Sequence, residues 1–198
     1  MTDTQVQRGR ATEQAIREAA LSCFSERGYH GASIRFIADR AGTSLSNVYN
    51  YVASKDELLA QLLRRASEAQ YAQVLEALDG AGEDPAERLR AAVEAYARYV
   101  IEHRDELVLS NTEFRYLSRP HRTEVVELRD RMQRLVDDLI EDGVRRGAFA
   151  TPYPADVSRS LLTMVSNITA WFQPEGALSA TEVARRHAGF ALALVEAG

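Results

Sequence analysis

The sequence holds one cysteine, four histidines and no long apolar run. Cys23 cannot form an intramolecular disulfide and belongs to no zinc-binding cluster, which is typical of a protein in the reducing cytoplasm. The start, Met1 to Gln14, lacks the apolar core of a signal peptide. The longest uncharged stretch, 160–174, has 15 residues and several polar ones, whereas a membrane span needs roughly 20 apolar residues. We expect a cytoplasmic chain with no membrane partner, no metal and no cofactor.

Proline is also scarce, and its placement indicates the fold class. All five prolines lie beyond residue 84, each between two stretches of helical apolar spacing. Strict alternation of apolar and polar residues, which is typical of strands, is absent from every long window. With 198 residues and 45% hydrophobic side chains, the chain can bury a sizeable core. The pattern predicts an all-α fold of about nine helices, at 11–27, 34–41, 45–51, 55–78, 85–103, 105–117, 120–146, 155–172 and 180–196.

The negative net charge of −5 argues against a protein that coats nucleic acid through bulk electrostatics. Its distribution is uneven, because residues 1–56 carry seven basic and six acidic side chains, a net +1, which leaves −6 for the remainder. A near-neutral first quarter on an acidic body permits a small anion-binding head that relies on placed contacts. Lys55 is the only lysine, and an ammonium at a helix start favours anion binding.

The segment from Gly28 to Leu59 carries the most specific pattern. Ser33 and Ser44 precede two short helices as N-caps, and Gly42 lies in the tight turn between them. This spacing is typical of a helix-turn-helix, whose second helix enters the major groove of DNA. The exposed face of that helix would offer small, hydrogen-bonding and aromatic groups: Thr43, Leu45, Ser46, Asn47 and Tyr49.

Over these thirty residues the chain resembles the TetR family of bacterial regulators. The matching residues are Gly28-Tyr29, Ile37-Ala38, Ala41-Gly42, Ser44, Tyr49, Ser54-Lys55-Asp56 and Leu58-Leu59. The resemblance implies a three-helix DNA-binding domain at 1–55 and a ligand-binding and dimerisation domain at 56–198. The full set of expected DNA-binding residues is Ser33, Thr43, Ser44, Leu45, Ser46, Asn47, Tyr49, Tyr51 and Lys55. The family usually has an aromatic residue where this chain has Val52, and the neighbouring Tyr51 can supply the ring. The alternative is a purely structural helix-turn-helix with Tyr49 and Tyr51 as core rings.

The last two expected helices are apolar on more than one face, which requires cover from more than one side. The TetR resemblance implies that they pair with their copies in a second subunit, so that a homodimer meets a near-palindromic operator in double-stranded DNA. The expected interface residues are Leu161, Leu162, Val165, Ile168, Phe172, Val183, His187, Phe190 and Leu194.

The central helices supply candidates for an effector pocket. We expect Phe114, Leu117, Met132, Leu135, Met164 and Trp171 to line it, although ordinary core packing is the alternative for each. Residues 111–132 and the Trp171-Phe172 pair resemble TetR proteins that control lipid or sterol breakdown and respond to acyl-CoA thioesters. Such a ligand needs cations for its phosphates, and the body is rich in arginine. The alternative is that these arginines form a solvated face with neighbouring carboxylates.

No nucleophile elbow, phosphate loop or zinc-protease motif accompanies the scattered polar residues of the body, so we expect no catalytic residues and no enzyme. The sequence predicts a repressor that a small hydrophobic effector, such as an acyl-CoA, releases from its operator. Two alternatives stay open: an activator or corepressor-dependent regulator, and a helical acyl-CoA-binding protein.

Overall fold

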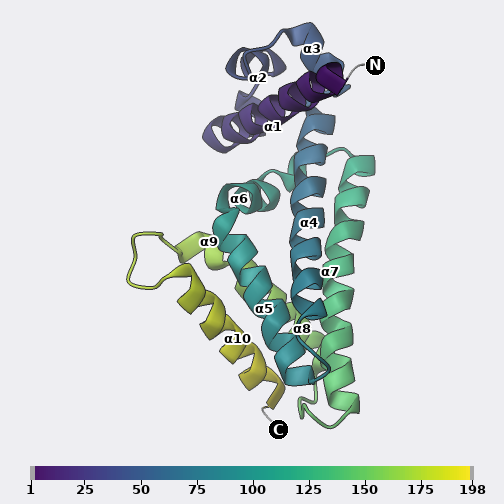
Figure 1. Cartoon of the computed structure of the whole chain (residues 1–198), viewed down its shortest axis with the longest axis vertical. Helices are drawn as coiled ribbons and strands as arrows, with labels where there is room; N and C mark the ends of the chain where they lie inside the picture. Colours follow the sequence, from purple (N-terminus) through teal and green to yellow (C-terminus); the bar gives the residue numbers. More distant parts are fainter. Residues whose placement is uncertain (1–2, 197–198) are drawn as a thin grey trace. The chain divides into compact units, whose positions relative to one another are not determined.

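The structure is a computed structural model that describes residues 3–196, with side chains placed from Thr12 to Val195. Helices connected by short turns make up this range, and no strand occurs within it, so the predicted all-α class is confirmed (Figure 1). No helix between residues 3 and 196 is long and apolar enough to cross a membrane. The elements are α1 (Asp3–Gly31), α2 (Ile34–Arg40), α3 (Leu45–Tyr49), α4 (Lys55–Asp79), α5 (Pro85–Glu102), α6 (Arg104–Thr112), the 3₁₀ helix η1 (Phe114–Tyr116), α7 (Arg119–Arg145), α8 (Pro154–Ser166), α9 (Ile168–Trp171) and α10 (Ala180–Glu196).

The first of two compact units comprises the residues up to 66 together with 108–126. In this unit α2 packs against both α1 and α3. One apolar cluster joins these helices to the first turns of α4, with Phe24 and Leu59 among its fully buried members. Ile34, Ile37 and Ala38 are buried, as the inward face predicted for the first short helix requires.

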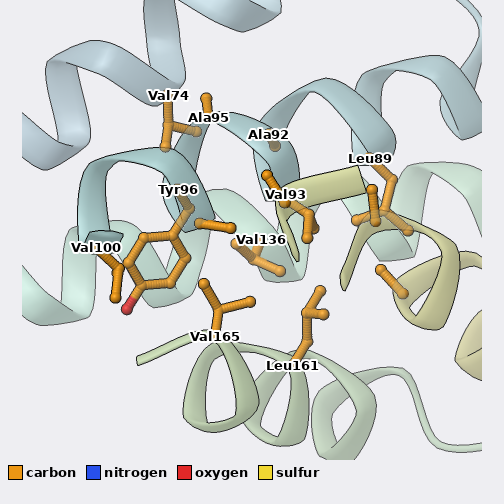
Figure 2. Packing of buried hydrophobic residues seen from close by; sticks show 14 of the residues in the cluster. Val74, Leu89, Ala92, Val93, Ala95, Tyr96, Val100, Val136, Leu161 and Val165 are labelled. Carbon is orange, nitrogen blue, oxygen red and sulfur yellow. The ribbon is translucent and has the colours of Figure 1, made fainter. Parts of the chain in front are cut away.

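The second unit comprises residues 67–107 and the chain from 127 onward. Its central helix is α5, which packs along α10 and also contacts α8 and α9. Figure 2 shows this core, where Leu89, Val93 and Tyr96 of α5 lie near Leu161 and Val165 of α8. Because α5 buries residues on most of its circumference, it is held from several sides at once.

The first helix has two boundaries that differ in how well the sequence predicts them. Gly28 has φ 66° and ψ 172°, so the regular helix ends where the pattern predicts, and one further turn follows the kink. At the other end α1 begins at Asp3 instead of residue 11. Apolar spacing starts only at Ile16, so periodicity carries no information on the polar turns before it.

Two predicted helices end several residues earlier than expected. The helix expected at 105–117 ends at Thr112, and the chain tightens into η1, where the Tyr116 N–H donates to the Glu113 carbonyl at 2.9 Å. The helix expected at 155–172 is divided into α8 and α9 at Asn167. Around this break the hydroxyls of Thr163 and Thr169 donate to carbonyls four and three residues earlier, a bonding mode that bends helices.

Candidate DNA-binding and effector sites

The two short helices of the first unit have the predicted caps. Ser33 Oγ accepts a hydrogen bond from the Phe36 N–H, and Ser44 Oγ accepts one from the Asn47 N–H, both at 3.1 Å. Between the helices Gly42 has φ 64°, a backbone conformation that residues with a Cβ rarely adopt. The turn therefore depends on glycine as well as on the caps.

The exposed face of α3 presents polar groups and one ring. Tyr49 is 51% exposed, and Ser44 and Ser46 are also exposed. The Asn47 amide donates to Thr43 Oγ1 at 2.7 Å, so these two side chains are oriented before any ligand binds. Leu45 and Tyr51 instead lie half-buried against the apolar cluster of the first unit. Val52 is buried in the same cluster.

Lys55 lies at the start of α4, where its ammonium contacts the end of α1. Lys55 Nζ donates to the carbonyls of Tyr29 at 2.7 Å and Ala32 at 2.9 Å, and it lies 4.3 Å from the centre of the Tyr29 ring. Desolvation by burial lowers its pKa. Two of its three N–H donors are thus engaged within the protein, which leaves at most one for a phosphate.

The arginines around α2 differ in how strongly each side chain is held by contacts within the protein. Arg40 pairs with Glu26 at 2.8 Å, and the hydrogen bond from Arg40 is the main cause that lowers the pKa of Glu26 to about 2. The Arg27 guanidinium lies 3.8 Å from the centre of the Phe36 ring. Arg35 is exposed in the first turn of α2. No motif marks Arg35, although a basic residue two positions after an expected N-cap is a feature visible in the sequence.

The first turn of α4 is clamped by the segment that begins α7. The two ring nitrogens of His121 lie 2.6 Å from Asp56 Oδ2 and 2.7 Å from Glu57 Oε2, and the Ser118 N–H donates to Asp56 at 2.9 Å. Burial raises the pKa of both carboxyls, but hydrogen bonds and the positive charges nearby outweigh it and the net shift is downward. A neutral imidazole has one N–H, so donation to both carboxylates requires the protonated ring.

The segment 113–116 contacts the end of α1 in the same unit. Glu113 is buried, and its carboxylate accepts a hydrogen bond from the Tyr29 N–H at 2.7 Å. The Tyr116 ring stacks on the Tyr29 ring with centroids 5.7 Å apart and meets His30 edge-on at 4.6 Å. The first unit therefore includes contacts that no helix-turn-helix pattern predicts.

The residues expected to line an effector pocket fall into three environments. Met132 is buried in the core of the second unit, and Leu135 and Met164 pack against that core. Leu117 is buried in the first unit's cluster, and Phe114 packs against it. Trp171 is 48% exposed on the second unit. The structure thus brings together three of the six within one core.

Most of the residues expected at a dimer interface are buried within the second unit itself. Those with less than 9% exposure are Leu161, Val165, Ile168, Phe172, Val183 and His187, while Leu162 is half-buried. Phe190 and Leu194 are exposed on α10. The Trp171 ring stacks on His187 at 6.0 Å, and His187 meets Phe190 edge-on at 5.7 Å. We call the exposed side chains of Trp171, Phe190 and Leu194, together with the buried His187 ring that contacts the first two, the aromatic patch.

The second unit also has a surface groove of about 640 Å³. Small and polar residues of α4 and α5 line it, and none of them was expected to bind an effector: Ala69, Ala72, Gln73, Glu76, Ala77, Ala95 and Arg98. Within the part of the chain that the structure describes, no group of three or more His, Cys, Asp or Glu side chains could hold a metal ion.

Two polar residues in the second unit occupy positions in phase with apolar stripes. Gln70 lies four residues from both Ala66 and Val74 in α4, and Arg129 lies three residues before Met132 in α7. Gln70 is only 9% exposed. No motif predicts a role for either residue, although a polar residue that interrupts an apolar stripe is a signal visible in the sequence.

The fold and the α2–α3 geometry define a helix-turn-helix DNA-binding protein. The family described as bacterial regulatory proteins, tetR family, matches residues 16–62, and the tetracyclin repressor-like C-terminal domain matches residues 82–195. The chain therefore belongs to the TetR family of transcriptional regulators. The predicted resemblance is confirmed.

Among its relatives is the HTH-type transcriptional repressor KstR2 of Mycobacterium tuberculosis, 27% identical over 179 residues that cover 89% of each chain. The TetR family regulator PfmR of Thermus thermophilus is 32% identical with a TM-score of 0.82, covering 90% of this chain and 97% of PfmR. AibR, solved with isovaleryl coenzyme A and operator DNA, superposes with a TM-score of 0.80 at 23% identity, covering 90% of this chain and 97% of AibR. At that identity the likeness to AibR shows the fold alone. By their names, KstR2 and PfmR are regulators of transcription.

Proposed function

We propose that this chain is a homodimeric repressor that a small hydrophobic effector releases from a near-palindromic operator. The observation that carries the proposal is α3 itself, a capped helix with an exposed polar face in a helix-turn-helix. The protein acts in the cytoplasm, where a bacterial regulator meets DNA. DNA binding belongs to residues 1–55, and effector binding and dimerisation belong to 56–198.

The expected DNA contacts divide by what each side chain is free to do. Tyr49, Ser46 and the Ser44 hydroxyl are exposed and can reach base edges or phosphates. Thr43 and Asn47 act as a pair that is already hydrogen-bonded. The remaining expected residues also stabilise the local fold. Ser33 caps α2, Leu45 and Tyr51 pack against the apolar cluster, and Lys55 donates hydrogen bonds to the end of α1.

The dimer forms through the exposed surface of α10 and its neighbour α9. An aromatic patch with Trp171 at 48% and Phe190 at 51% exposure is a large apolar surface for an isolated subunit. A partner that covers it with the same patch forms a two-fold interface. The buried residues of the expected set, such as Leu161 and Val165, then pack below the interface residues and do not contact the partner.

The effector is an acyl-CoA or a similar apolar molecule that enters the second unit near Met132, Leu135 and Met164. Support for this ligand class comes from AibR, which shares the fold and was solved with isovaleryl coenzyme A. Helix α4 contributes residues to both units, so a shift of α4 would change the spacing of the two heads. Release requires the effector to favour the state that does not fit DNA, with a coupling of roughly 1–3 kcal/mol.

The test begins with selection of duplexes from a random DNA library by the purified protein. We expect an inverted repeat with half-sites about one helical turn apart. Tyr49→Ala together with Thr43→Ala should abolish binding of the selected duplex without changing the circular dichroism spectrum. Tyr153→Ala, at an exposed tyrosine of the second unit, is the matched control and should bind like the wild type. Retained binding by the double variant would overturn the assignment of α3.

A further inference from the structure

A polar cluster surrounds the Tyr96 hydroxyl inside the apolar core of the second unit. Tyr96 is 9% exposed, and Figure 2 shows its ring among core valines that include Val100 and Val165. The hydroxyl lies 3.2 Å from Ser166 Oγ. Because Ser166 donates its own hydrogen to the Leu162 carbonyl, the Tyr96 O–H is the donor toward Ser166. The oxygen of Tyr96 keeps its lone pairs but has no second hydrogen to give.

Gln70 of α4 reaches the same cluster with an unused amide. The side chain is 9% exposed and lies close enough to Tyr96 to lower the pKa of that hydroxyl, which burial raises. Among the described residues, Gln70 Nε2 has no hydrogen-bond partner. A buried amide nitrogen without a well-placed acceptor is a rare and unfavourable state for a folded protein, so an acceptor oxygen of a ligand would stabilise it.

Arg129 of α7 adds positive charge to the cluster. Desolvation by burial lowers the pKa of its guanidinium, and its charge acts on Tyr96. Apolar side chains, including Val74 and Val136, make up the surrounding core. An acceptor oxygen attached to an apolar body suits the Gln70 amide in these surroundings.

We propose that Gln70, beside Arg129 and the Tyr96 hydroxyl, binds the acyl oxygen of the effector, whose apolar chain packs near Met132, Leu135 and Met164. Gln70 Nε2 donates directly to that oxygen, and Arg129 supplies the positive charge. The acyl oxygen belongs either to a thioester carbonyl or to a free carboxylate. This inference rests on the proposed function, since it assigns the polar end of the same effector.

The experiment compares the wild type with Gln70→Leu and Gln70→Glu by calorimetric titration with butyryl-, octanoyl- and oleoyl-CoA and with the corresponding free acids. We expect binding to the wild type, about tenfold weaker binding to Gln70→Leu, and none to Gln70→Glu, which replaces the donor by an acceptor. Gln73→Leu, in the surface groove of the same helix, is the matched control and should bind like the wild type. Comparison of the titrations with thioesters and with free acids identifies the source of the acyl oxygen.

A second readout separates a ligand role from a structural one. Without ligand, Gln70→Leu should melt about 2–4 °C higher than the wild type, because it removes an unpartnered buried amide. A lower melting temperature, wild-type affinity in Gln70→Leu, or no binding of any of these acyl compounds to the wild type would overturn the inference. Operator binding by the unliganded variants tests the proposed function separately, because it does not depend on Gln70.

Discussion

Lys55 shows how a single residue can be found in the sequence while part of its role is missed. Its position as the only lysine, directly before an apolar helix, was sufficient to mark it as a candidate. The bonds to the carbonyls of Tyr29 and Ala32 join residues 23 or more positions apart. No local pattern encodes such contacts, because they depend on how α1 and α4 pack. Lys55 therefore stabilises the DNA-binding fold whether or not it also meets a phosphate.

Replacing Lys55 by methionine should destabilise the protein by about 1–3 kcal/mol, because the loss of the ammonium leaves two carbonyls without their charged donor. Urea denaturation followed by circular dichroism measures this change. Arg65→Met, at an exposed basic residue of the same helix, should cost less than about 0.5 kcal/mol. Equal stability of Lys55→Met and the wild type would show that the carbonyl contacts contribute nothing.

The carboxyls of Asp56 and Glu57 predict how stability depends on pH. Their folded pKa values lie below the ordinary values of 3.8 and 4.5, so ionisation favours the folded state. This contribution is fully present above those ordinary values and is lost as the pH falls through the lowered folded values. Asp56→Asn should be less stable than the wild type at pH 7, and the gap should narrow toward pH 3.

Urea titrations at pH 7, 5 and 3 check this expectation. Asp79→Asn, at an exposed residue of the far end of α4, serves as the control and should show no such gap. A difference between Asp56→Asn and the wild type that stays constant down to pH 3 would contradict the role of the Asp56 carboxylate in the clamp with His121.

At the scale of elements, the sequence predicts helices well where apolar spacing and caps agree. The bounds of α2, α4 and α10 differ from the expected ranges by at most one residue, since Ser33, Ser54 and Ser179 each precede a clear apolar stripe. The prediction was wrong about the ends of α6 and α8. Those ends depend on the Glu113 turn and on hydroxyl bonds back to the helix backbone, neither of which changes the apolar period.

The last turn of α1 follows a kink at Gly28, so its position depends on the backbone conformation of this glycine. Its φ of 66° and ψ of 172° lie in a region that is essentially restricted to glycine, with a cost of order 1–3 kcal/mol for other residues. Gly28→Ala should lower the free energy of unfolding by this amount. Gly80→Ala, at a glycine without positive φ, should stay within about 0.5 kcal/mol of the wild type. Thermal denaturation of both variants distinguishes strain from a general effect of the added methyl group.

For the molecule as a whole, the aromatic patch leads to a prediction about assembly. Leu194 and Leu75 are each 38% exposed, but only Leu194 belongs to the patch. Leu194→Arg should place a charge in the proposed two-fold interface and convert a dimer into a monomer of about 22.0 kDa. Leu75→Arg, the same change at the same exposure on α4, should stay dimeric. Sedimentation velocity at micromolar concentration separates the two outcomes, and equal masses for both variants would contradict the interface.

Local sequence patterns also predict a site only where its residues are close together in the sequence. The helix-turn-helix residues are close in sequence, so the spacing from Ser33 to Lys55 was enough to place them on neighbouring elements. The Gln70–Tyr96–Arg129 cluster is drawn from three helices whose packing no short motif describes. Its members could be noticed one by one as polar residues in apolar stripes, but their meeting at one hydroxyl required the three-dimensional structure.

A ligand-released repressor requires that effector binding weakens operator binding. The most direct test is fluorescence anisotropy of a labelled duplex, selected by the protein from the random library, titrated with protein before and after addition of octanoyl-CoA. We expect a sequence-specific complex whose dissociation constant rises about 5- to 150-fold with the thioester. An unchanged dissociation constant while the thioester binds the protein would contradict a ligand-released repressor.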